Sequence, residues 1–205
     1  MKLYYGPGTC SLAAHIIGHE LDLDLDLEKV DLKSKLTTSG ADYTAINPKG
    51  YVPALEIDRG ILLTEGPAVL QYLAAQRPER HLLPAEGTIE RYRALEWLGF
   101  INSELHKTFT PLWHAESPTA AKDAARATLA RRFRYLDHHL ATHRYLLGAA
   151  FTLPDAYCFT VVNWSNYLQL DLTPYPNLKR YMSEIETRPA VEAAMAVEGL
   201  KQAAQ

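Results

Sequence analysis

The chain has 205 residues, of which 47% are hydrophobic and 22% charged, enough for one large or two small globular domains with a sizeable core. Its net charge of −3 and the lack of a basic run exclude a general electrostatic attraction to nucleic acid or to an anionic membrane. The first residues have one lysine and no long apolar run, so we expect neither a signal peptide nor a membrane span. With only two cysteines, Cys10 and Cys158, the composition favours a reducing compartment, and we expect a cytoplasmic protein.

The first elements are predicted from short local patterns. Residues 1–5 predict a strand that Gly6-Pro7-Gly8 ends, and residues 10–20 predict a helix. Residues 21–28 alternate strictly between leucine and an acid, which is typical of a half-buried strand. Residues 31–47 are polar and irregular, with a short helix at most.

The most informative stretch is GYVPALEIDRGILLTEGPAVLQYL, residues 50–73. Pro53 begins a strand over 54–58, because proline cannot donate to a β-ladder and belongs at a strand start or edge. An Asp58-Arg59-Gly60 turn leads to a strand over 61–63, and Thr64-Glu65-Gly66-Pro67 opens an amphipathic helix. The strand start offers backbone groups to an extended peptide, and the helix N-terminus favours an anion. Together they suit a small zwitterionic peptide, although a βββα unit without a ligand is the plain alternative.

The second part of the chain is predicted to be helical. A proline-containing linker over 81–86 separates a domain of residues 1–78 from one of residues 86–205. Residues 154–168 are apolar all round, as in a buried central helix, and Thr152-Leu153-Pro154-Asp155 has the form of a capping box before it. The other helical segments are marked by Tyr92, Leu95, Trp97, Phe100 and Leu105, by Leu129, Phe133, Leu136 and Leu140, and by the ranges 177–187 and 190–200. The order of elements, βαβ and ββα followed by helices, predicts an α/β thioredoxin-like N-terminal domain and an all-α C-terminal domain.

Cys10 is the sharpest candidate for chemistry. It follows Gly6-Pro7-Gly8 at a predicted helix start, where the helix dipole and the unbonded N–H groups stabilise a thiolate. No second cysteine follows at the C-x-x-C spacing, which excludes a two-cysteine thioredoxin cycle, so a thiol from outside the chain would have to resolve a mixed disulfide. The plain alternative is a buried structural cysteine.

The segments PGTCS, NPKGYVPAL, LTEGPAVLQYL and ELHKTFTPL, and the final AVEGLK, resemble those of the bacterial beta-class glutathione S-transferases almost from end to end. The resemblance implies the glutathione transferase fold, a preceding cis bond at Pro53, glutathione as co-substrate without a further cofactor, and a homodimer. It implies that Cys10 and His106 are catalytic. The implied glutathione-binding residues are Cys10, Lys35, Val52, Glu65, Gly66, Ser103, Glu104 and His106, with Glu104 reaching toward the ligand of a partner subunit.

The chain departs from the pattern of the class at two positions. Gly66 stands where most relatives have a serine, so only the backbone N–H at the helix start is available there. Gly99 stands where the class usually has an asparagine, and Asn102 is a candidate to replace that contact.

Several other residues have competing interpretations. Tyr5 is a candidate hydroxyl donor to the glutathione sulfur, with core packing as the alternative, and Ser11 is either such a donor or a first-turn cap. The pairs His15/His19 and His139/His143 have i, i+4 spacing but no third ligand or HExxH pattern, so we expect no metal site.

The predicted function is transfer of glutathione to a hydrophobic aryl or alkyl electrophile, a detoxification activity, with thiol–disulfide exchange through Cys10. Side chains expected to hold the electrophile are Phe109, Leu112, Trp113 and Trp164. One alternative is a glutathione-dependent disulfide reductase or dehalogenase. Another is a ligand-binding protein without turnover, which would not need a reactive thiol.

Overall fold

The computed structural model describes residues 1–58 and 60–200, so Arg59 of the predicted Asp58-Arg59-Gly60 turn lies outside the described residues. The chain forms two compact units. The first comprises Met1–His81 together with the chain from Arg188 onward, and the second comprises Leu82–Thr187. The last helix therefore groups with the first unit, whereas the sequence-based division assigned residues 86–205 to one helical domain.

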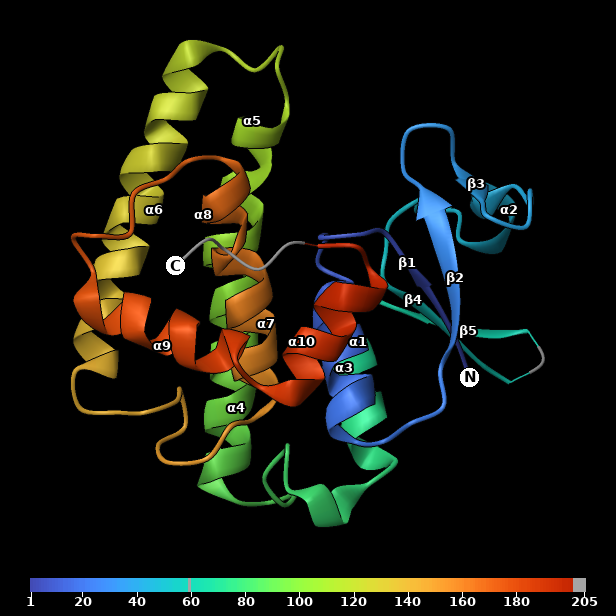
Figure 1. Ribbon diagram of the computed structural model, residues 1–205, viewed down its shortest axis with the longest axis horizontal. Coiled ribbons are helices and arrows are strands. Elements are labelled where there is room, and N and C mark those ends of the chain that lie inside the picture. Colours follow the sequence, from blue (N-terminus) through green and yellow to red (C-terminus); the bar gives the residue numbers. More distant parts are fainter. Residues whose placement is uncertain (59, 201–205) are drawn as a thin grey trace. The chain divides into compact units, whose positions relative to one another are not determined.

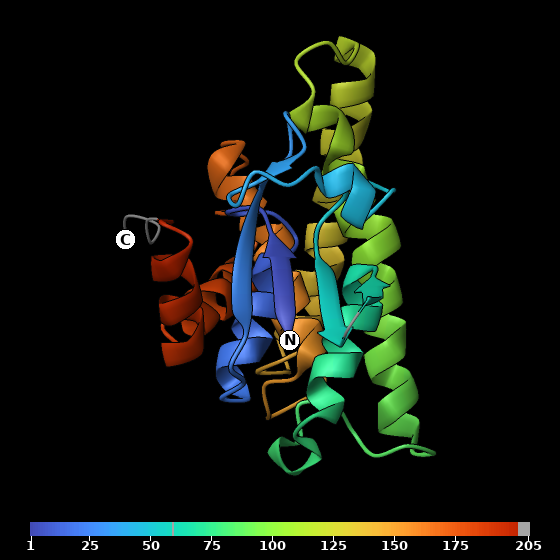
Figure 2. The same cartoon turned by 90° about the vertical axis from the view of Figure 1, so that its right-hand side faces the viewer.

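The first unit is built on a five-stranded mixed sheet in the order β3-β2-β1-β4-β5. β1 runs parallel to β2 and antiparallel to β4, so that Leu3 lies between Leu27 and Leu55. Helices α1 and α3 lie on one face of this sheet, and α10 packs against α1 (Figures 1 and 2). The thioredoxin-like α/β fold expected of this part is therefore confirmed. The bounds are β1 Lys2–Tyr5, α1 Leu12–Glu20, β2 Asp26–Asp31, β3 Leu36–Thr37, α2 Tyr43–Ile46, β4 Ala54–Asp58, β5 Ile61–Thr64, α3 Gly66–Ala75, η1 Pro78–Arg80 and α10 Pro189–Val197.

The predicted strand over residues 21–28 is wrong in its position. The strand β2 begins only at Asp26, where it pairs with Lys2 of β1. The residues before it form the turn that follows α1, in which the Leu23 N–H donates to the carbonyl of Gly18 at 2.9 Å. The leucines of the segment are still more buried than the aspartates. The alternation therefore predicted burial correctly, but it did not predict where strand pairing begins.

Helix α10 is attached to the first unit by a buried acid. Glu198, whose side chain is fully buried, accepts from the Gly8 N–H at 2.8 Å and lies 3.1 Å from His15 Nδ1. A buried carboxylate needs such partners because its desolvation is otherwise unfavourable. These contacts explain why the C-terminal helix packs with α1.

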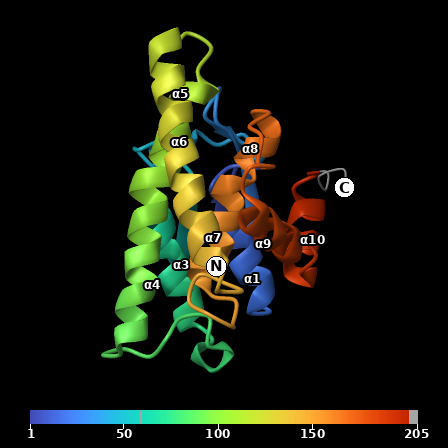
Figure 3. The same cartoon turned by 90° about the vertical axis from the view of Figure 1, so that its left-hand side faces the viewer.

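The second unit is a bundle of helices in which α4 and α6 run alongside one another (Figure 3). Trp97 and Phe100 of α4 pack against Tyr135 of α6, with ring centroids 5.8 and 5.3 Å away. The bounds are α4 Ile89–Phe100, η2 Ile101–His106, η3 Lys107–Phe109, α5 Thr110–Trp113, α6 Thr119–Leu140, α7 Leu153–Val162, α8 Trp164–Tyr167 and α9 Pro176–Glu186.

The predicted first long helix is broken into four pieces. After α4, η2 is a π-helix, η3 is a 3-10 helix and α5 is a single α-turn. Of the residues that marked this helix in the sequence, Trp97 and Leu105 are buried, whereas Tyr92 is exposed. By contrast, Leu129, Phe133, Leu136 and Leu140 of α6 are buried as predicted.

Helix α7 is the buried centre of the second unit, and all ten of its residues are buried. It begins with the predicted capping box, in which the Asp155 carboxylate accepts from the Thr152 N–H at 2.8 Å and the Thr152 side chain accepts from the backbone of Asp155. Asp155 also accepts from the Leu146 N–H and from the Tyr181 hydroxyl. The box therefore fixes both the start of α7 and its neighbours.

We expect Thr152→Ala to lower the free energy of unfolding by about 0.5–2 kcal/mol, the usual range for loss of an N-cap. Activity of the folded fraction should be nearly normal, because the cap supplies no chemistry. Urea unfolding and initial rates on the same preparation measure both quantities. Strong loss of turnover at unchanged stability would contradict the capping role.

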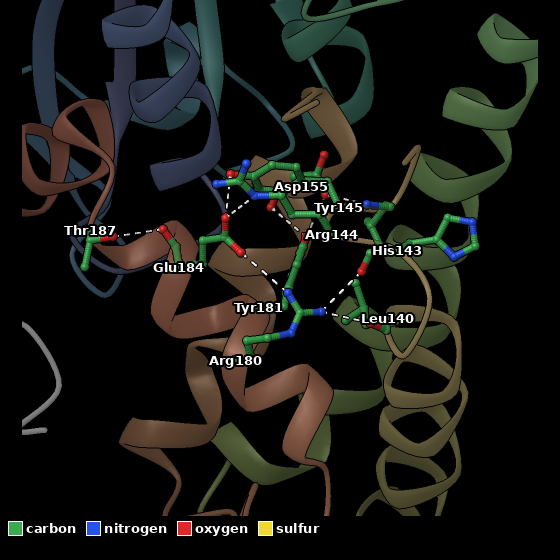
Figure 4. Close-up of polar contacts among 10 residues, drawn as sticks. Leu140, His143, Arg144, Tyr145, Asp155, Arg180, Tyr181, Glu184 and Thr187 are labelled. Atoms are coloured by element: carbon green, nitrogen blue, oxygen red, sulfur yellow. Dashed lines mark hydrogen bonds and ion pairs between the residues drawn. The ribbon is translucent and has the colours of Figure 1, made fainter. Parts of the chain in front are cut away.

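A polar cluster closes the C-terminal end of α6 (Figure 4). Arg180 donates to the carbonyls of Leu140 and His143 at 2.8 and 3.2 Å, which helps to satisfy carbonyls that have no partner within a helix. Glu184 forms ion pairs with Arg180 and with Arg144. The shallow hollow around Arg180 contains none of the expected site residues, and we interpret the cluster as structural.

Burial raises the pKa of Asp155 to about 6, although several donors favour its ionised form. Because this pKa lies above the unfolded value, the folded protein holds the proton more tightly between about pH 4 and pH 6. Stability from this group is therefore present at the acid end and falls as pH rises through that window, by roughly 2–3 kcal/mol. We expect urea unfolding between those limits to show this decline in the wild type relative to Asp155→Asn, which cannot titrate. Parallel pH dependences of the two proteins would contradict the expectation.

Candidate active site

Cys10 lies in the turn just before α1, half-buried. Its Sγ donates to the backbone carbonyl of Val52 at 3.0 Å. The Val52–Pro53 peptide bond is cis, as the resemblance implies, and β4 begins immediately afterwards at Ala54. The fold thus brings the predicted nucleophile directly onto the predicted peptide-binding strand start.

The loop that carries Cys10 is held by hydroxyl groups. Ser11, fully buried, donates to the Gly6 carbonyl at 3.2 Å and accepts from the Gly6 N–H at 3.1 Å. Thr9 Oγ1 lies 2.8 Å from Ser11 Oγ and also donates to Gly6. The first-turn cap expected of Ser11 is wrong, because its side chain makes no capping hydrogen bond to α1; the hydroxyl instead bonds to Gly6 and holds the loop.

Tyr5 is buried, and its ring centroid lies 6.0 Å from that of His15. Burial, together with the charge of Glu198, raises the pKa of the phenol. A neutral hydroxyl remains able to donate, so a direct role for Tyr5 stays a prediction, while its contacts are those of a core residue.

Glu65 stands at the helix start with an unusual backbone. Its φ of 71° and ψ of 120° are uncommon for a residue with a side chain, and such conformations cluster at ligand sites. Its carbonyl accepts from the N–H groups of Ala68 and Val69 at 3.0 Å. Because Pro67 has no N–H, the Gly66 N–H is the first-turn donor that this helix start could offer to an anion. The Glu65 carboxylate is paired with Lys49 at 2.7 Å, a neighbour that the sequence analysis did not single out.

Lys35 belongs to the same unit and reaches the loop before Pro53. Its Nζ donates to the Gly50 carbonyl at 3.0 Å. Its backbone is left-handed, with φ 60°, and its carbonyl accepts from the Tyr43 N–H at 2.8 Å. The ammonium group is therefore held beside the loop that contains Val52, where a carboxylate of a bound peptide would be complemented.

The site residues expected in the second unit share one unusual element. Asn102, Ser103, Glu104 and His106 all lie in the π-helix η2. π-Turns are rare and occur preferentially at functional sites, because the extra residue per turn redirects side chains. Nothing in the apolar periodicity of the sequence signalled this turn.

Two of these residues have neighbours within the unit. Glu104 forms an ion pair with Arg132 of α6. Ser103 Oγ donates to the Gly99 carbonyl at 3.0 Å. A Cβ at Gly99 would meet nothing within 4 Å, so packing within the structure does not explain why this chain has glycine there.

His106 is joined to Asn102 through a tyrosine. His106 Nδ1 lies 2.7 Å from the hydroxyl of Tyr157, and that hydroxyl donates to Asn102 Oδ1 at 2.9 Å. Tyr157 is only 1% exposed and belongs to α7. Sequence analysis missed Tyr157 because it lies 51 residues from His106 in a segment whose only signal was its apolar character.

Three of the four side chains expected to hold an electrophile meet around one indole. The Trp164 ring is 5.5 Å from Phe109, 5.8 Å from Trp113 and 4.9 Å from His106, all edge-on. Trp113 is 46% exposed, whereas Phe109 is buried. Leu112 is half-buried. Trp164 is also buried, so Trp113 is the ring of this cluster that is substantially exposed.

Cys158, the second cysteine, lies in the buried helix α7. Burial and the charge of Asp155 raise the pKa of the Cys158 thiol, which leaves it inert. Within residues 1–58 and 60–200, no three His, Cys, Asp or Glu side chains are arranged to hold a metal ion. No helix of the same described part is long and apolar enough to cross a membrane.

The thioredoxin-like unit and the helical unit with these side chains define the fold class of the glutathione transferases. Residues 8–76 match the glutathione S-transferase N-terminal domain, and residues 100–189 match the glutathione S-transferase C-terminal domain. Glutathione S-transferase GstA of Escherichia coli O157:H7 is 45% identical over 98% of this chain and 100% of its own.

Solved structures of glutathione S-transferases are also similar to this chain. A sphingomonad glutathione S-transferase complexed with glutathione is 43% identical, with a TM-score of 0.94 over 98% of this chain and all of its own. The bacterial beta-class glutathione S-transferase of Sphingomonas chungbukensis is 42% identical, with the same TM-score and coverage. The chain belongs to the glutathione S-transferase family, in its bacterial beta class, and is an enzyme of that family.

Proposed function

We propose that this transferase binds glutathione along the Val52–Pro53 strand start, transfers it to hydrophobic electrophiles and exchanges disulfides through Cys10. The observation that carries the proposal is the 3.0 Å contact from Cys10 Sγ to the Val52 carbonyl. It places a thiol at the point where an extended peptide would pair with the backbone. The sphingomonad relative solved with glutathione supports the choice of peptide.

In conjugation, the bound glutathione thiolate attacks the electrophilic carbon and the leaving group departs with the bonding electron pair. In exchange, the Cys10 thiolate attacks one sulfur of a disulfide and expels the other as a thiolate. A second glutathione thiolate then attacks the mixed disulfide and releases Cys10. Glu65, the N-terminus of α3 and Lys35 would bind the charged ends of the tripeptide. Trp113 and Leu112 would contact an apolar co-substrate, with the buried Trp164 and Phe109 packed behind Trp113.

A panel of aryl halides, haloalkanes and mixed disulfides, each assayed with glutathione, tests this function. Turnover of aryl halides and mixed disulfides is expected. Turnover of haloalkanes or disulfides alone would favour the dehalogenase or reductase alternative. Binding of glutathione without turnover, and a Cys10 thiol whose alkylation rate follows an ordinary cysteine titration, would favour a non-catalytic binding protein.

We further propose a homodimer in which Glu104 approaches the γ-glutamyl ammonium of the partner subunit's ligand. Its pair with Arg132 would then orient the carboxylate. We expect subunit exchange between Cys10→Ala/Glu65→Ala and Glu104→Gln to restore part of the glutathione affinity, because one of the two mixed sites has every residue intact. Calorimetry on the exchanged sample measures the recovery. No recovery after confirmed exchange would place Glu104 outside the partner's site, and a monomeric mass in solution would remove the proposal.

A further inference from the structure

The hydrogen-bond chain from Asn102 through Tyr157 to His106 lies wholly within the helical unit. Its two links measure 2.9 and 2.7 Å, both within the ordinary range of hydrogen bonds. Asn102 and His106 lie in the π-helix, and Tyr157 projects from α7, whose first turn is fixed by the Thr152–Asp155 capping box. The phenol therefore stands on a fully buried helix whose first turn is held by a capping box.

Counting protons assigns the direction of the chain. A phenol has one proton to donate, and here it goes to Asn102 Oδ1, an atom that has no proton of its own. The 2.7 Å contact with His106 must then take its proton from Nδ1. A neutral His106 in this arrangement carries its proton on Nδ1 and has its lone pair on Nε2, since the partner of one ring nitrogen sets the state of the other.

The ring plane is fixed as well. The Tyr157 and Trp164 rings meet the imidazole edge-on, at interplanar angles of 81° and 75°. Turning the imidazole over would replace Nδ1 by a carbon atom against the phenol and lose the hydrogen bond. Both the protonation and the direction of the basic nitrogen are thus determined by neighbours of His106.

We infer that Tyr157, oriented by Asn102, is a positioning residue that keeps the proton-accepting nitrogen of His106 at Nε2. Its importance for turnover rests on the proposed function together with the catalytic role that the resemblance to the beta class implies for His106, as a base toward the glutathione thiol. A base that presents the wrong nitrogen cannot accept a proton from that direction, however well the rest of the site is built. The role would make Tyr157 and Asn102 specific supports of the imidazole, beyond their packing.

The deciding experiment is nitrogen NMR on protein labelled with ¹⁵N-histidine, with the His106 signals among the eight histidines assigned through His106→Gln. The wild type should show His106 protonated at Nδ1. Asn102→Leu removes the acceptor, so the phenol should donate to Nδ1 and move the histidine proton to Nε2. Asn102→Asp, which can only accept, should keep the wild-type tautomer. Tyr175→Phe, which removes a buried hydroxyl that donates to the Ala130 carbonyl, is the matched control and should change nothing at His106.

Kinetics complete the test. Tyr157→Phe should lower kcat by about tenfold, a part of the usual effect of a general base, and shift its pH profile, with little change in the KM for glutathione. Nε2 protonation in the wild type, or an unchanged tautomer in Asn102→Leu, would overturn the inference whatever the turnover. An unchanged pH–rate profile in Tyr157→Phe would overturn the positioning role. The expected tautomers in a protein that turns over no substrate with glutathione would support the hydrogen-bond chain and count only against the proposed function.

Discussion

Cys10→Ala is expected to abolish thiol–disulfide exchange, while conjugation of glutathione to a reactive aryl halide survives in part. Exchange needs a protein sulfur that can form and break a disulfide, whereas conjugation needs only the thiolate of bound glutathione. The Cys10 Sγ lies at the Val52 carbonyl, on the strand start proposed for the tripeptide, so a mixed disulfide there would keep the ligand backbone in place. Mass spectrometry of the wild type should show a glutathione adduct on Cys10.

Cys158→Ala is the matched control, because the chain has only these two cysteines. The Cys158 thiol is fully buried and its pKa is raised, so its removal should leave exchange intact. An adduct on Cys158, together with exchange that persists in Cys10→Ala, would contradict the assignment of Cys10 as the nucleophile.

Glu65→Ala is expected to raise the dissociation constant of glutathione by about tenfold or more, because a lost charge-assisted hydrogen bond costs roughly 1.5–3 kcal/mol. Glu65 stands in a strained backbone conformation at the start of α3, which points to a ligand role for the acid. Its pair with Lys49 is well exposed, and exposed pairs contribute little to stability. The free energy of unfolding should therefore change little.

Calorimetric titration of glutathione into the variant measures this effect. Glu79→Ala, which removes an exposed acid from η1 of the same unit, is the control for charge alone and should bind normally. Unchanged affinity in Glu65→Ala would mean that the tripeptide binds elsewhere.

The sequence alone determined the elements whose ends are set by local residues such as proline, glycine and a helix cap. Pro53, Gly60 and Pro67 bound β4, β5 and the start of α3 within a residue of the prediction, because proline and glycine restrict or free the backbone wherever they stand. The capping box before α7 was equally readable, because it depends on neighbours a few positions apart. The apolar pattern over 154–168 predicted the buried helix but not its end, since α7 stops at Val162 and α8 follows from Trp164. The position of Cys10 before α1 followed from the same kind of signal.

Tertiary structure decided the features that depend on distant partners. The start of β2 at Asp26 is set by pairing with β1, so the leucine and aspartate alternation before it predicted burial and not a strand. The π-helix that carries Asn102 and His106 has no periodicity that a sequence pattern reveals, and the link from His106 to Tyr157 spans 51 residues. Glu198 joins Gly8 across 190 residues, which places the last helix in the first unit. A local pattern can show that a side chain is buried, but its hydrogen-bond partner is chosen only when the folded chain brings the two together.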